Sequence, residues 1–123
     1  MNAETIAKPR STATAKATAA ELGISEYSFE IICRVMRGIP QIERALVFGS
    51  RAKGTYKKGS DIDIALMGEG VGEALAMDVS GRLNESEPLP YFVDIVALNA
   101  LAPGAFRDHI QRVGKYLYER TES

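Results

Sequence analysis

The sequence has little of what disulfides, thiolate metal sites and membrane spans require. Its 123 residues include one Cys, one His and no Trp, so an internal disulfide and a zinc site built from Cys and His alone are both excluded. No apolar run approaches the roughly 18 residues of a membrane span, and residues 1–20 lack the apolar segment of a secretory signal. We therefore expect a cytoplasmic protein with no membrane partner.

The chain also lacks an excess of charge of either sign. Fifteen Lys and Arg are balanced by sixteen Asp and Glu, which gives a formal net charge of −1 at pH 7. Such a chain has no overall field that attracts nucleic acid, so a nucleic-acid partner is not expected. Any positive charge that binds phosphate must be local.

The length and composition are typical of one globular domain. At about 150 residues per domain the chain has no room for a second one, and its 46% hydrophobic and 25% charged residues suit a modest core. Residues 11–20 offer nothing large and apolar to bury. We expect residues 1–20 to be a flexible tail and residues 21–123 to be the folded domain.

Hydrophobic periodicity predicts helices that alternate with strands. A stretch with apolar residues three and four positions apart is typical of a helix, and short apolar or alternating runs are typical of strands. This order indicates an α/β or α+β fold, with a sheet and helices packed over it. The expected elements are a helix after Ser25 that stops at Gly38, strands at 45–48, 61–66 and 91–97, helices at 71–83 and 103–114, and a short edge strand at 116–118.

Three acidic residues do not suit a purely structural role in these strands. Asp61 and Asp63 share one face of their strand, about 6.5 Å apart by the usual rise, so they repel each other unless a cation lies between them. Asp94 interrupts an apolar run, where a buried and unpaired carboxylate would cost several kcal/mol. If the two strands are neighbours, three carboxylates converge, an arrangement that binds Mg²⁺ and in two-metal sites catalyses displacement at phosphorus.

A basic loop follows the first strand. Residues 49–60 contain four basic residues and no acidic one, so we expect an anion there. Gly49 allows a sharp turn, and the Ser50 hydroxyl could donate to a phosphate oxygen. Arg51 could bind two phosphate oxygens at once, and Lys53 could act as a point charge. A polyphosphate is the natural ligand of such a loop.

The spacing of these residues resembles a known family. Gly49-Ser50, ten intervening residues, Asp61-Ile-Asp63 and a later strand with Asp94 are similar to the nucleotidyltransferase superfamily of DNA polymerase beta. Within it the chain resembles the minimal nucleotidyltransferases (MNT). The resemblance implies a mixed sheet flanked by helices. It also implies metal binding by Asp61 and Asp63, with Asp94 completing the triad and orienting or deprotonating the attacking hydroxyl.

The same resemblance implies a reaction. Gly49 and Ser50 would hold the triphosphate, Arg51 would assist, and Lys53 replaces the Arg that is commoner in the family motif. We therefore expect a metal-dependent enzyme that transfers a nucleoside monophosphate, AMP in the first place, from a nucleoside triphosphate to a hydroxyl. Two Mg²⁺ ions are the expected cofactor, with Mn²⁺ as the alternative.

Partners are implied by the resemblance alone. Many minimal members pair with a small helical protein of the HEPN or substrate-binding kind, and some pairs are toxin and antitoxin. We expect such a helical partner here. The alternative is an antitoxin or complex subunit that acts mainly by binding its partner, and the sequence leaves a homo-oligomer or a heterotetramer open.

Overall fold

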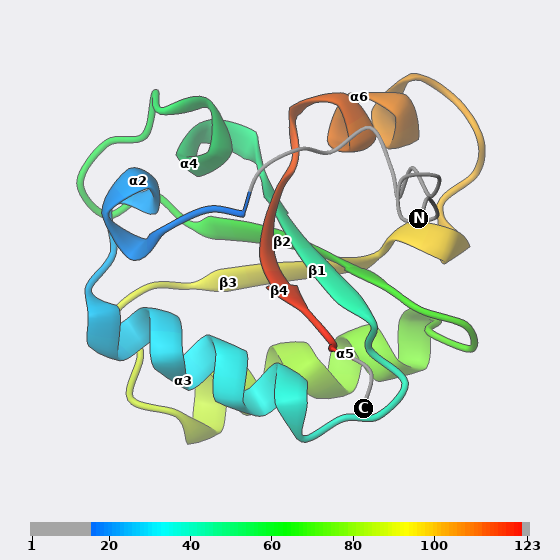
Figure 1. Ribbon diagram of the computed structural model, residues 1–123, viewed down its shortest axis with the longest axis horizontal. Coiled ribbons are helices and arrows are strands. Elements are labelled where there is room, and N and C mark those ends of the chain that lie inside the picture. The colour runs from blue at the N-terminus through cyan, green and yellow to red at the C-terminus, as the bar shows by residue number, and fades with distance from the viewer. Residues whose placement is uncertain (1–15, 122–123) are drawn as a thin grey trace, which may run out of the picture.

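The structure, a computed structural model, describes residues 16–121 (Figure 1). None of the described helices is long and apolar enough to cross a membrane. In chain order the elements are α2 (Ala19–Leu22), α3 (Glu26–Arg37), β1 (Arg44–Phe48), α4 (Gly49–Lys53), β2 (Ile62–Met67), α5 (Glu73–Gly81), the π-helical turn η1 (Arg82–Ser86), β3 (Val93–Ala97), the 3-10 turn η2 (Leu98–Ala100), α6 (Ala105–Val113) and β4 (Lys115–Glu119).

The strands form one sheet in the order β3-β2-β1-β4. β1 runs antiparallel to both β2 and β4, while β2 and β3 are parallel. The mixed sheet flanked by helices is therefore confirmed, as is the edge position of the last strand. The strands expected at 61–66 and 91–97 begin one and two residues later than predicted.

Helices cover the two faces of the sheet unequally. In Figure 1, α3 and α5 lie on one side and α4 and α6 on the other. Alternation along β2 sends Ile62, Ile64 and Leu66 into the larger core, while Ala65 belongs to a smaller core with Ile110 of α6. The side chain of a residue such as Asp63, which alternates with those isoleucines, therefore lies on the α6 side.

The tail expected over residues 1–20 is wrong for residues 16–20. The amide of Ala17 donates to the carbonyl of Tyr116 at 2.7 Å, and Ala17 is buried. Thr18 and Glu21 form a capping box that starts α2. Backbone pairing and capping need no bulky side chain, so these small residues take an ordered position on the domain. Residues 1–15 lie outside the described residues.

Candidate active site

The centre of the site is the turn between β1 and α4. β1 is central and buried, and its last residue, Phe48, is the Cα partner of Asp63 in β2. Gly49 follows with φ of +74°, a conformation that favours glycine. A Cβ at this position would overlap Oδ2 of Asp63. The glycine thus lets the start of α4, with Ser50 in its first turn, lie directly against a carboxylate.

The sheet register places the two strands that carry the acidic residues side by side. Asp63 and Asp94 are Cα partners in the parallel pair of β2 and β3. Asp61 is the residue immediately before β2, and it is exposed. Burial raises the pKa of the Asp63 carboxyl above its ordinary value, and the negative charges of Asp94 and Asp61 raise it further. The three carboxylates therefore interact electrostatically across adjacent strands.

The donor set fits a hard divalent cation. Carboxylate oxygens are the ligands that Mg²⁺ prefers, and crowded like charges favour a cation between them. Within residues 16–121, no three Asp, Glu, His or Cys side chains are close enough to be a formed metal site. Binding an ion would therefore draw the carboxylates together.

Asp94 differs from its expected environment. The apolar run around it predicts burial, but Asp94 is exposed. The reason is that β3 is an edge strand, and Ile95 and Val96 beside Asp94 are only partly buried. The carboxylate therefore needs no buried partner, and it is open to a molecule that approaches the β3 edge.

Arg51 corrects the prediction of a phosphate-binding arginine. Its side chain is 2% exposed and its donors point at backbone carbonyls. Nη1 donates to Leu22 at 2.8 Å and to Gly23 at 3.3 Å, while Nη2 and Nε both donate to Ser60, at 2.8 and 3.1 Å. Because the side chain is buried and four of its five N–H groups donate to backbone carbonyls, this guanidinium is not free to bind two oxygens of a triphosphate.

Aromatic rings complete the surroundings of this arginine. The guanidinium lies 4.9 Å from the ring centroids of both Tyr56 and Tyr91, within cation–π range. Ser60 directly precedes Asp61, and Tyr91 lies two residues before β3. Arg51 therefore fixes the entry of both strands that carry the carboxylates, and it is a positioning residue.

Lys53 remains the expected cation of the loop. It lies in the last turn of α4 and is exposed, in contrast to Arg51 two residues earlier. A mobile ammonium can reach an anion that a buried guanidinium cannot.

The sequence reading missed the aromatic residues of this face. Phe106 of α6 is 51% exposed and meets the ring of Phe48 edge-on, with centroids 5.9 Å apart. Tyr56 and Tyr91 were not singled out either. The only sequence signal for them is a tyrosine within the basic loop and another at the start of an apolar run, which is too common to identify a contact with arginine.

Comparisons with known proteins agree with this geometry. A family model described as polymerase beta, nucleotidyltransferase, matches residues 30–123. The chain belongs to this nucleotidyltransferase family. A curated relative from Haemophilus influenzae, described as a probable protein adenylyltransferase MntA, is 29% identical over 104 residues, which cover 85% of this chain and 90% of the relative. This nucleotidyltransferase is thus similar to MntA over most of its length.

Solved structures show the same fold. A crystal structure of a toxin–antitoxin with AMP-PNP superposes with a TM-score of 0.60 at 26% identity, over 79% of this chain and 75% of that one. A tri-AMPylated Shewanella oneidensis HEPN toxin in complex with an MNT antitoxin gives a TM-score of 0.58 at 23% identity, over 77% and 72% of the two chains. The second likeness supports the fold alone.

Proposed function

We propose that this nucleotidyltransferase transfers AMP from ATP to a hydroxyl of a helical partner protein. The observation that carries the proposal is the register of Asp63 with Asp94 directly beside the Gly49 turn. Asp61, Asp63 and Asp94 would hold divalent metal, Mg²⁺ first and Mn²⁺ as the alternative. Gly49, Ser50 and the exposed Lys53 would hold the triphosphate. A reaction that consumes ATP needs a compartment that contains it, so we expect the cytoplasm.

The chemistry is an in-line displacement at the α-phosphorus. The acceptor oxygen forms a bond to phosphorus, the bond to the bridging oxygen breaks, and pyrophosphate leaves. Asp94 is open to the acceptor and would orient its hydroxyl and take its proton. Bound metal would neutralise the charge of the phosphates and of the transition state.

The names of the relatives support the substrate and the partner. The Haemophilus relative is described as a protein adenylyltransferase, and the solved structure at 26% identity is that of a toxin–antitoxin with AMP-PNP. An exposed Asp94 at an edge strand is consistent with a large acceptor, because no other described strand blocks the approach from that side.

The test replaces two of the proposed metal ligands and measures the transfer of radioactive AMP. The variant Asp61→Asn with Asp63→Asn should lose transfer from α-³²P-ATP to the co-expressed partner, because neutral amides lack the negative charge that attracts the ion. Asp78→Asn, on the exposed side of α5, is the matched control and should keep the parent rate. Transfer that survives in the double variant at the parent rate would contradict the assignment.

A second function is favoured by the toxin–antitoxin description of the AMP-PNP complex. In this alternative the chain silences a helical partner mainly by contact. The same double variant separates the two: if it still neutralises the partner in a growth assay, contact suffices, and if neutralisation is lost together with the label, transfer is required.

A further inference from the structure

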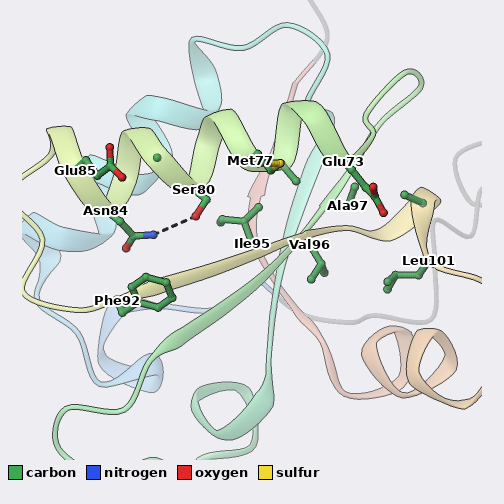
Figure 2. Close-up of a pocket in the computed structure, with 13 residues that line it drawn as sticks. Glu73, Met77, Ser80, Asn84, Glu85, Phe92, Ile95, Val96, Ala97 and Leu101 are labelled. Atoms are coloured by element: carbon green, nitrogen blue, oxygen red, sulfur yellow. Dashed lines mark hydrogen bonds between the residues drawn. The ribbon is translucent and has the colours of Figure 1, made fainter.

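A groove of about 520 Å³ opens between α5 and the outer edge of β3 (Figure 2). It does not contain the carboxylates of the active site. Much of its lining is apolar, and the residues used below are Met77, Phe92, Ile95, Val96, Glu73 and Glu85.

The apolar lining is unusually open to solvent. Met77 is 73% exposed and Phe92 is 54% exposed. The other large exposed apolar side chains among residues 16–121 are Tyr27 and Phe106, which lie outside the groove. Two large apolar groups at one groove favour a site that a partner covers.

The outer edge of β3 offers backbone groups to that partner. The carbonyl of Phe92 accepts from Ile62 of β2, so the backbone of alternate residues faces away from the sheet. At Val93, the side chain of Asn84 takes up both outward groups: its Oδ1 accepts from the amide and its Nδ2 donates to the carbonyl, each at 2.8 Å. The next outward position is Ile95, where the edge strand has no strand neighbour.

The groove adjoins the active site through β3. Phe92 and Val96 lie two residues before and two residues after Asp94, so all three share one face of the strand. A chain seated against Phe92 and Val96 therefore passes Asp94, the carboxylate that we assign to the acceptor hydroxyl.

The charge of the groove is of one sign. Among the described residues that line it, the ionisable side chains are Glu73 and Glu85. Figure 2 shows them at opposite ends of the groove. An occupant that is apolar in the middle and basic at both ends complements this pattern.

We propose that the groove seats an extended segment of the acceptor protein. The segment pairs with the outer edge of β3 at Ile95, places apolar side chains against Met77 and Phe92, and directs basic residues to Glu73 and Glu85. Its hydroxyl then lies beside Asp94. This inference rests on the proposed transfer to a protein hydroxyl, and it adds where and in what conformation the acceptor binds.

A synthetic peptide tests binding without any reaction. The probe is the nonapeptide Arg-Lys-Thr-Val-Tyr-Val-Thr-Lys-Arg, titrated into ¹⁵N-labelled protein without ATP. We expect amide shifts concentrated at Phe92, Ile95 and Met77, and slower hydrogen exchange at Ile95. The same peptide with Glu and Asp at its ends should bind about tenfold more weakly. No binding, shifts elsewhere, or equal binding of the acidic peptide would overturn the proposal.

Variants then link the groove to catalysis. Met77→Glu should weaken peptide binding about tenfold and raise the KM for the peptide in AMP transfer, with the KM for ATP unchanged. Tyr27→Glu is the matched control, because Tyr27 is 67% exposed, close to the 73% of Met77, but lies on α3. An equal effect of both variants would contradict a specific groove.

Failure of this inference differs from failure of the proposed function. A peptide that binds at Ile95 but never gains AMP supports the groove and counts against transfer to a protein hydroxyl. A peptide that gains AMP while its shifts lie elsewhere supports transfer and overturns the groove.

Discussion

The two faces of the sheet differ in what they bury, and two neighbouring residues of β2 show the difference. Ile64 is fully buried against the α3 and α5 side, where the larger core lies. Asp63, one residue earlier, faces the side of α6, where burial and neighbouring charges work against its ionised form. The apolar face therefore contributes most of the free energy of folding. The other face lowers it, because it holds a carboxylate close to two like charges.

The largest effect is expected on the buried face. Ile64→Ala should lower the free energy of unfolding by about 2–5 kcal/mol, because it removes buried methyl groups and leaves a cavity. Urea denaturation measures the loss, and Ile64→Val, which should cost only about 0.5–1.5 kcal/mol, is the graded control. If Ile64→Ala unfolds at the parent urea midpoint, the division between the faces is wrong.

Arg51→Lys should show that the hydrogen bonds of Arg51 stabilise the fold and do not bind phosphate. A lysine can satisfy at most part of the carbonyls and lacks the planar group over the tyrosines, so we expect a loss of about 2–3 kcal/mol in unfolding free energy. Lys53→Ala is the counterpart on the surface: it should leave stability unchanged and raise the KM for ATP. If Arg51→Lys instead raises the KM for ATP and leaves stability unchanged, Arg51 binds the phosphates.

Gly49→Ala sharpens the comparison at the site itself. The added Cβ meets Asp63, so transfer should fall by about a hundredfold, while left-handed strain costs about 1–2 kcal/mol. Gly59→Ala has a similar φ of +85° with no atom within 4 Å of the new Cβ, so it isolates the strain. Steady-state kinetics and thermal denaturation of the pair separate the two effects; similar kinetics in both variants would exclude a role for the Asp63 contact.

The smallest effect is a gain. Because the pKa of Asp63 is raised in the folded state, the native protein loses stability as pH rises from the ordinary carboxyl range through that pKa. Asp63→Asn has no such charge, so its Tm should exceed that of the parent at neutral pH, and the gain should shrink toward acidic pH. Added Mg²⁺ should stabilise the parent alone and narrow the gap. A lower Tm at neutral pH would disprove the repulsion.

The sequence predicts this fold well where local patterns are strong, and less well where neighbours decide. Alternation in β2 and the spacing from Gly49 to Asp63 locate the strand and the turn, because both are local. The burial of Arg51 depends on carbonyls of Leu22 and Ser60, far apart in the chain, and no local pattern reveals them. The exposure of Asp94 likewise depends on β3 lying at the edge, which its apolar run does not show.

The paired hydrogen bonds of Asn84 with Val93 have a consequence for assembly. The carboxamide of Asn84 forms the two hydrogen bonds that a neighbouring strand would form with Val93. It therefore shortens the part of β3 with which a strand of another copy could pair. A strand that adds here can therefore form hydrogen bonds with the β3 backbone at Ile95 but not at Val93. The same side chain therefore leaves fewer open backbone groups along β3 to which a second copy of this chain could bond.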